Sequence, residues 1–241
     1  MLMRSLETNA GHRRHRESGF SLLEMLTVVA LSIVMVAITF ISMVPVMKQQ
    51  RVTNAYNTTL AAMRLARDNS ISQRTSYSVT FSNAAIPNTI VVAPTLGFGG
   101  NQNANGTLIT YTYQLPTDVT FQTNSAISAT AAPDSGAGAS FGTGTNAIDF
   151  GYTAASNTGG QNIIYFCPDG SAQTASCTET VNGIVYSTAG GYSLNWDDGV
   201  VYLARTGDLL SSRAITLWGG TGRIHGWRLY AKTGGYQWLR Q

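Results

Sequence analysis

Charged side chains are scarce in this sequence and unevenly distributed. Only 11% of the 241 residues are Asp, Glu, Lys or Arg, and neither Lys nor Arg occurs between Arg74 and Arg205. A chain this poor in charge, with a middle rich in Ser, Thr, Asn and Gly, is unusual for a cytosolic enzyme and suits a β-rich domain outside the cell. The basic residues lie before and after this middle region, where we expect any anionic partner to bind.

Residues able to carry out catalysis or bind metal are also few. The sequence has three histidines, of which only His225 follows residue 19, and it contains neither G-x-S-x-G nor H-E-x-x-H. The segment Gly219-Gly220-Thr221-Gly222 resembles a glycine-rich phosphate-binding loop. Too few residues follow it, however, for the helix and second strand of a nucleotide-binding unit. We therefore expect a protein that is not an enzyme and has no cofactor and no metal site.

Charge is absent altogether from Met25 to Met47. As a helix this apolar segment would be about 35 Å long, enough to cross the core of a bilayer. The first 19 residues hold four arginines against two glutamates, so the positive-inside bias predicts a cytoplasmic N-terminus and places everything after Met47 on the opposite side. The chain is thus expected to be a single-pass membrane protein with an exported domain.

The junction before the apolar segment reads Ser18-Gly19-Phe20-Ser21-Leu22-Leu23-Glu24. A secretory signal would place small residues and a cleavage site after its apolar segment, whereas here they come before it. This motif resembles the type IV pilin superfamily. The resemblance implies that a prepilin peptidase removes a leader of residues 1–19 by cutting between Gly19 and Phe20, that Phe20 is then N-methylated, and that residues 20–47 form a transmembrane helix that becomes the filament core.

Glu24 is an ionisable residue one turn inside this apolar helix, and such residues are usually functional. The resemblance implies that its carboxylate pairs with the N-terminal amine of a neighbouring subunit during assembly. The alternative is a carboxylate that reaches back to the lipid headgroups. With Gly19 and Phe20 beside it, the assembly role is favoured.

Cys167 and Cys177 are the only two cysteines, and turn residues lie between them. In an exported protein this spacing predicts a disulfide that closes a surface loop, worth about 2 to 3 kcal/mol. Two buried free thiols are the alternative, and a metal site is less favoured because too few other ligands exist.

After Met47 the pattern predicts an amphipathic helix over 48–72 and then a β-rich domain over 73–241. The helix carries apolar residues at spacings of three and four, namely Val52, Tyr56, Leu60, Met63 and Ala66. Pro45 is expected to kink it. Short runs with a period of two then predict strands, at 77–81, 89–93, 108–114, 119–123, 147–152, 163–167, 184–187, 192–196, 200–204, 214–218 and 223–230. Segments 96–107 and 125–145 lack periodicity and are expected to be surface loops.

The expected fold is α+β, with one long N-terminal helix packed on an antiparallel, sandwich-like β-domain. Three stretches make the chain most similar to the GspH/FimT group of minor pseudopilins and minor pilins: Met63–Asp68 with Gln73-Arg74, Phe166–Ser171, and Ala214–Leu217 with Gly222–Ile224. The resemblance implies a structural subunit of a type IV pilus or a type II secretion pseudopilus, near the filament tip. Before assembly, the subunit would lie in the bacterial inner membrane with its domain in the periplasm. Its partners would be prepilin peptidase, other pilins, the inner-membrane assembly platform and, before assembly, membrane lipid.

An alternative function is DNA binding by a competence pilus. Some FimT-like proteins bind DNA through a C-terminal Gly-Arg-x-Arg, and the matching positions here read Gly222-Arg223-Ile224-His225. The histidine weakens the match, but cations and aromatic rings alternate nearby, as on nucleic-acid-binding surfaces. The candidate residues are Arg223, Arg228, Lys232 and Arg240. The strand-like alternation favours a structural role for the aromatic residues over DNA binding.

Overall fold

The structure is a computed structural model that describes residues 20–95, 107–123, 133–134, 141, 146–151, 160–181, 184–187 and 196–241. The chain divides into two units, one ending at Val46 and the other comprising Met47–Gln241. Helix α1 (Leu22–Gln73) contributes its first part to one unit and its second part to the other. The helical assignment is continuous through Pro45, where we had expected a kink.

The first part of α1 exposes its side chains on every side. No residue from Phe20 to Gln50 is buried, and the exposed residues include Leu31, Ile38 and Ile41. It is the only described helix that is long and apolar enough to span a membrane. A helix that is apolar all round needs lipid or other helices around it.

The second part of α1 buries one face. The buried positions recur every three or four residues, as expected for a helix that packs along one side: Val52, Ala55, Tyr56, Thr59, Ala62, Met63, Ala66 and Ser70. The predicted apolar stripe is confirmed, with Leu60 only partly buried. The helix ends at Gln73, and Arg74 then adopts a positive φ of 51°, a common way to terminate a helix.

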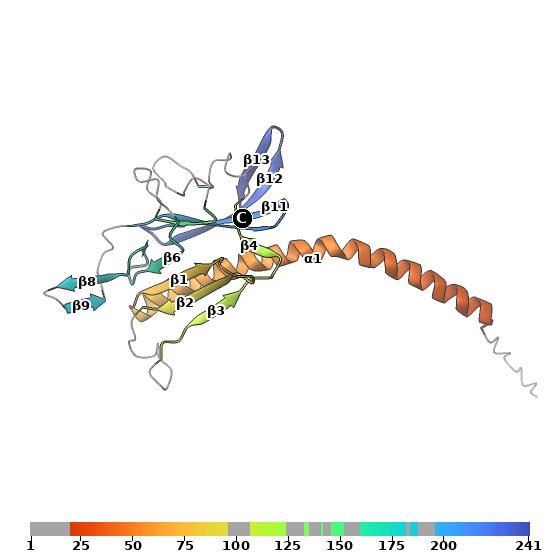
Figure 1. The fold of residues 1–241 in the computed structure, drawn as a ribbon, viewed down its shortest axis with the longest axis horizontal. Coiled ribbons are helices and arrows are strands. Elements are labelled where there is room, and N and C mark those ends of the chain that lie inside the picture. The colour runs from red at the N-terminus through yellow and green to blue at the C-terminus, as the bar shows by residue number, and fades with distance from the viewer. Residues whose placement is uncertain are drawn as a thin grey trace, which may run out of the picture. The chain divides into compact units, whose positions relative to one another are not determined.

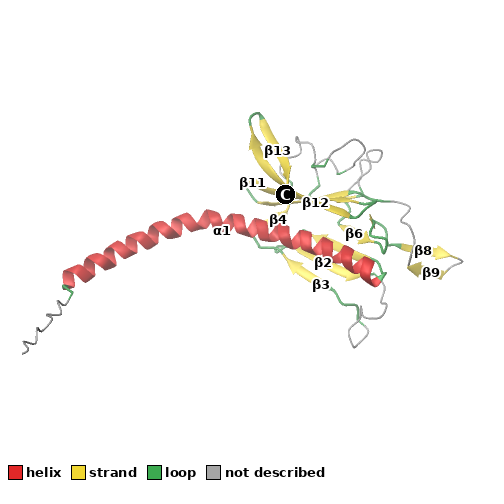
Figure 2. Cartoon of the chain, turned by 180° about the vertical axis from the view of Figure 1, so that it is seen from behind, coloured by secondary structure: helices red, strands yellow, loops and turns green. Residues whose placement is uncertain are grey.

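Two antiparallel sheets contact this part of the helix. The five-stranded sheet has the order β3-β2-β1-β6-β7, and the six-stranded sheet has the order β13-β12-β11-β10-β4 with β5 also pairing with β10. Figures 1 and 2 view the domain from opposite sides and show the second part of α1 alongside both sheets. The fold is therefore α+β, as predicted.

The strand bounds follow the order of the chain. The first seven strands are β1 (Tyr77–Ser82), β2 (Thr89–Pro94), β3 (Tyr111–Gln114), β4 (Val119–Phe121), β5 (Ile148–Phe150), β6 (Ile163–Phe166) and β7 (Ala172–Gln173). A separate hairpin follows, made of β8 (Thr178–Val181) and β9 (Ile184–Ser187). The last four are β10 (Gly199–Arg205), β11 (Asp208–Trp218), β12 (Arg223–Lys232) and β13 (Gly235–Arg240).

One hydrophobic core joins α1 to both sheets, and it includes Met63, Phe81 and Ile215. Buried and half-buried residues alternate along β1, as the period of two in its sequence predicts. The helix approaches β12 closely at Gly226, where a Cβ atom would collide with the Tyr56 hydroxyl group. A larger residue at this position would force the Tyr56 side chain to move.

Several strand predictions differ from the structure. Strands β7, β8 and β13 were not predicted, and β12 continues two residues beyond the predicted end at Tyr230. Trp196, predicted to end a strand, lies outside any strand, and residues 192–195 lie outside the described part. Most of the two predicted loops, 96–107 and 125–145, also lies outside it.

Candidate functional site

Glu24 lies in the first turn of α1 with its side chain exposed. Within the described part of the chain, its carboxylate has neither a hydrogen bond nor an ion pair, and only its backbone oxygen accepts a bond, from Thr27 Oγ1 at 2.8 Å. Phe20 is 73% exposed, whereas Gly19 lies outside the described residues. The carboxylate is thus available to a group from another molecule.

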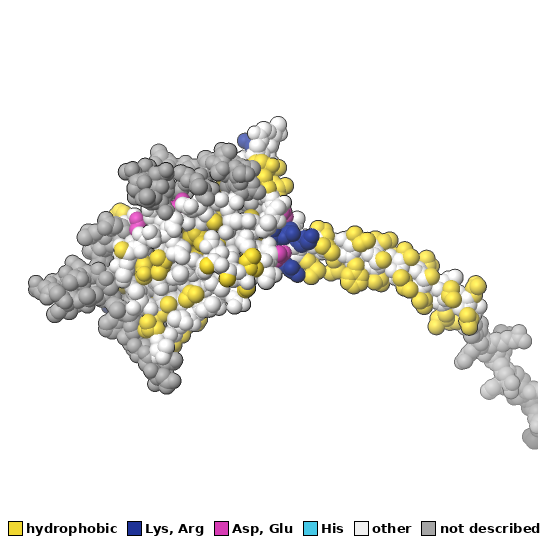
Figure 3. Space-filling model, in the orientation of Figure 1, with side chains coloured by type: hydrophobic (Ala, Val, Ile, Leu, Met, Phe, Trp, Pro, Cys, Tyr) yellow, Lys and Arg dark blue, Asp and Glu magenta, His cyan; other side chains and the backbone are white. Residues whose placement is uncertain are grey.

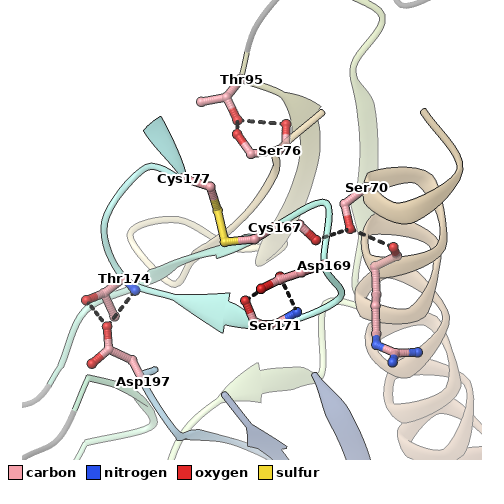
Figure 4. The surroundings of a disulfide bond; sticks show 10 residues. Ser70, Ser76, Thr95, Cys167, Asp169, Ser171, Thr174, Cys177 and Asp197 are labelled. Carbon is pink, nitrogen blue, oxygen red and sulfur yellow. Dashed lines mark hydrogen bonds between the residues drawn. A yellow bond between two sulfur atoms is a disulfide. The ribbon is translucent and has the colours of Figure 1, made fainter. Parts of the chain in front are cut away.

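The predicted disulfide between Cys167 and Cys177 is present. It closes a loop that also contacts the last turns of α1, since Ser70 Oγ donates to the Cys167 carbonyl oxygen at 3.1 Å (Figure 4). Within the loop, Asp169 Oδ1 accepts bonds from the backbone N–H and the hydroxyl group of Ser171. The loop is therefore fixed both by covalent closure and by hydrogen bonds to the helix.

Arg67 connects this loop to the turn between β11 and β12. Its Nε donates to the Gly170 carbonyl oxygen at 3.4 Å, and its Nη2 donates to the Thr221 carbonyl oxygen at 3.1 Å. Gly222 has a φ of +58°, and a Cβ atom there would collide with the Gly170 carbonyl oxygen. Parts of all three sequence stretches that carry the GspH/FimT resemblance, far apart in the chain, meet at this arginine.

A pocket of about 430 Å³ opens beside Arg67. Besides Arg67, its charged lining residues are Arg64, Asp68 and Arg223, and the remaining lining comes from Thr221, Gly222 and Ile224. Among the described residues, none of the three arginines forms an ion pair with a carboxylate. Three guanidinium groups around one opening could bind a phosphate or a carboxylate.

The four C-terminal cations proposed from the sequence do not form one surface. Arg223 lines the pocket, while Arg228 lies directly across from Arg213 on β11. Lys232 and Arg240 are both exposed but lie at opposite ends of the β12–β13 hairpin, because Lys232 pairs with Gly235 and Arg240 with Trp227. Arg223 instead lies near Arg64 and Arg67, which line the same pocket.

Arg213 is 5% exposed, and its Nη1 donates to the carbonyl oxygens of Ser211 and Ser212. Burial, with a further contribution from the neighbouring Arg228, lowers the pKa of Arg213 to about 10. The side chain therefore still carries its charge at neutral pH. Arg228 in turn lies over the ring of Tyr230, 5.0 Å from its centroid, in a cation–π contact.

His225, which replaces the second arginine of the DNA-binding motif, is buried and points to a structural partner. Its Nδ1 lies 2.7 Å from Asp134 Oδ2, which also accepts bonds from Thr216 Oγ1 and Trp218 Nε1. Burial by itself would raise the pKa of Asp134, but the hydrogen bonds from Trp218, His225 and Thr216 outweigh it and lower the pKa. A position with these contacts is not available to a phosphate of DNA.

The aromatic residues near the C-terminus divide between core and surface. Trp238 is 7% exposed and packs against Tyr202, with 5.9 Å between the ring centroids. Trp227 is partly buried and packs against the hydrophobic cluster that contains Tyr202 and Trp238, and its Nε1 donates to Thr216 Oγ1. Tyr230 and Tyr236 are 38% and 39% exposed. The structural interpretation is therefore correct for the two tryptophans.

The described residues contain no group of three or more His, Cys, Asp or Glu side chains that could hold a metal ion. Comparison of the chain with models of known protein families, with curated proteins and with solved structures found no match.

Proposed function

We propose that this protein is a minor pilin or pseudopilin, a structural subunit whose N-terminal helix is inserted in the bacterial inner membrane and then assembled into a type IV pilus or a type II secretion pseudopilus. The observation that carries the proposal is the contrast along α1. Its first part exposes apolar side chains on all sides and carries one exposed carboxylate, Glu24, whereas its second part is packed into a folded domain. A helix of this kind requires partners from outside its own chain.

The proposed assembly step uses Glu24. In lipid, an unpaired carboxylate is costly, and an amine from a neighbouring subunit would remove that cost when the two helices pack together. That amine would be the N-terminus of Phe20, created when prepilin peptidase cuts after Gly19. The globular domain would then lie on the surface of the filament or at its tip.

The experiment has two parts, both using the full-length chain in a bacterium that supplies a prepilin peptidase and the filament machinery. Mass spectrometry of the mature N-terminus should find N-methylated Phe20, and a Gly19→Leu variant should remain uncut. A Gly19→Leu chain that still begins at Phe20 would contradict the proposed processing.

Assembly is tested on the processed chain. Glu24→Gln should abolish or strongly reduce recovery of the subunit in sheared filaments while leaving it in the membrane. Asp68→Asn is a matched control, because Asp68 is exposed on the same helix but lies in the folded domain. Equal recovery of the Glu24→Gln and wild-type subunits would rule out the ion-pair role.

DNA binding remains a second candidate because Arg64, Arg67 and Arg223 line one pocket without carboxylate partners. If this pocket binds the DNA backbone, affinity should fall steeply with salt, and the Arg64→Ala/Arg223→Ala variant should lose most of it. The control is Lys232→Ala/Arg240→Ala, which removes two cations far from the pocket. Absence of binding by the wild-type protein at low salt would exclude this function.

A further inference from the structure

The end of the Met47–Gln241 unit at which the chain enters carries a linked series of charges. Arg51 Nη1 lies 3.6 Å from Asp118 Oδ2, which lies 3.4 Å from Arg205 Nε, and Arg205 Nη1 lies 3.2 Å from Asp208 Oδ2. These contacts place the start of β4, the end of β10 and the start of β11 near the first turns of α1 in this unit. Figure 3 shows Lys and Arg side chains gathered at this end of the domain.

The β12–β13 hairpin turns at the same end of the sheet. Arg228 on β12 pairs with Arg213 on β11, and the strands are antiparallel, so residues after Arg228 run toward the end where β11 begins. The pairing with β11 stops at Arg228, whereas the pairing with β13 continues to Lys232 and Gly235. Figure 1 shows the hairpin projecting from the rest of the sheet.

The tip of this hairpin has an aromatic ring on each face. Tyr230 pairs with Gln237, and its neighbour Ala231 pairs with Tyr236, so the two tyrosines point to opposite faces. Both rings are more than one third exposed, and Leu239 and Leu210 nearby are 44% and 49% exposed. Arg228 holds Tyr230 by the cation–π contact.

The charges at this end favour an anionic partner. Asp118 and Asp208 are already paired with Arg51 and Arg205, whereas within the described part of the chain neither Lys48 nor Lys232 has a carboxylate partner. Exposed tyrosines and unpaired lysines together are typical of protein segments at the interface between lipid and water. Anionic headgroups attract each such cation by about 1 kcal/mol.

We propose that this end of the domain, including the tip of the β12–β13 hairpin, binds the anionic headgroups of the same membrane that holds residues 25–47. The apolar segment ends at Met47, one residue before Lys48, so the chain itself keeps this end of the domain near the membrane surface. The inference rests on the proposed membrane insertion. It adds a lipid-bound state of the domain, which the subunit would leave when it enters a filament.

The chain offers a direct test because Lys48 and Lys232 are its only lysines. The full-length protein is reconstituted in vesicles of phosphatidylcholine alone or of phosphatidylcholine with phosphatidylglycerol, and flotation first establishes that it is inserted. A small, membrane-permeant amine-acylating reagent is then added, and mass spectrometry follows modification of each lysine. We expect acylation of Lys232 to slow by about fivefold in the anionic vesicles, and high salt to reverse part of the effect.

A variant separates the contribution of the rings. Tyr230→Ser/Tyr236→Ser keeps Lys232 and changes only side chains that are more than one third exposed, so the domain should still fold, which chemical unfolding can check. In this variant the slowing should be clearly smaller. The matched control Ile86→Ser, at a residue that is 64% exposed elsewhere in the domain, should behave as wild type.

Two results would overturn the inference. One is equal acylation of Lys232 in neutral and anionic vesicles that have both passed the flotation test. The other is slowing that depends on protein density at fixed lipid composition, which would assign the hairpin to a second subunit. Failure of flotation would instead refute the membrane insertion in the proposed function, so the two failures are distinguishable.

Discussion

The two parts of α1 differ in where their side chains find partners. In the first part, Met35 is 71% exposed and Glu24 has no partner among the described residues. In the second, Met63 is fully buried and Arg67 donates to two backbone carbonyl oxygens. In one helix, the first segment can bury its apolar side chains only against other molecules, whereas the second segment buries them against the sheets of its own chain. Helix formation and burial are therefore determined separately in this protein.

The largest change in unfolding free energy should come from truncating Met63 in the second part of α1, with Met35 in the first part as the matched control. Met63→Ala leaves a cavity in the core that α1 shares with both sheets and should cost about 2 to 5 kcal/mol of unfolding free energy. Met35→Ala should leave the domain's unfolding unchanged within about 0.5 kcal/mol. Denaturant unfolding of the full-length protein in detergent, followed by tryptophan fluorescence, measures both. Similar losses for the two variants would remove the contrast.

Removal of the disulfide measures how much this covalent link within the chain contributes to the stability of the domain. Cys167→Ser/Cys177→Ser should lower the unfolding free energy by about 2 to 4 kcal/mol, because the loop that contacts the end of α1 is no longer closed in the unfolded chain. The same denaturant titration provides the measurement. Adding reductant should destabilise the wild type and leave this variant unaffected.

Asp134 and Glu24 compare a carboxylate that has hydrogen-bond partners inside the domain with one that has none among the described residues. The pKa of Asp134 is lowered in the folded state, so its contribution to stability is present above the unfolded pKa of about 3.9 and is lost as pH falls through the folded value. Asp134→Asn should therefore cost about 1 to 3 kcal/mol at neutral pH and flatten the acid limb of the stability curve. Glu24→Gln should leave the stability of the folded domain unchanged, because Glu24 lies in the other unit of the chain. Unfolding of the Asp134→Asn variant and the wild type at a series of pH values provides the measurement.

The smallest effect concerns two arginines one turn apart on α1. Arg67→Ala removes the bonds to Gly170 and Thr221 and should cost about 1 to 2 kcal/mol. Arg64 is exposed and makes no ion pair with a described carboxylate, so Arg64→Ala should stay within about 0.5 kcal/mol. A larger loss for Arg64→Ala would show that the pocket arginine also stabilises the fold.

Much of the fold could be predicted from the sequence where the pattern is local. The buried face of α1 follows from apolar residues at helical spacing, and β1 and β2 follow from runs with a period of two. Strand β10 follows from a short, continuous apolar run. Strand β13 could not be predicted because it begins at Gly235, directly after Gly234, and only one of its residues is buried, so pairing with β12 decides it. Strand β7 is only two residues long and depends on pairing with β6.

The candidate sites likewise divide into those that a local sequence pattern reveals and those that only tertiary contacts create. Glu24 and the cysteine pair stand out in the sequence because a lone carboxylate beside an apolar segment, and a lone pair of cysteines, are visible without any fold. The pocket of Arg64, Arg67 and Arg223 could not be predicted, because its members come from a helix and a distant turn. The comparison with Gly-Arg-x-Arg predicts a surface position for His225, whereas in the structure this residue is buried and bonded to Asp134.

The sequence by itself determined the apolar segment, the position of Glu24, the amphipathic continuation of the helix and the α+β class, since each depends on residue type and period along the chain. The tertiary structure alone decided which polar residues are satisfied internally and which remain exposed. It brought Arg67 to Gly170 and Thr221, buried His225 against Asp134, and left Tyr230, Tyr236 and Lys232 exposed at a hairpin tip. The physical reason is that hydrogen bonding and burial depend on contacts between distant segments, which only the folded chain creates.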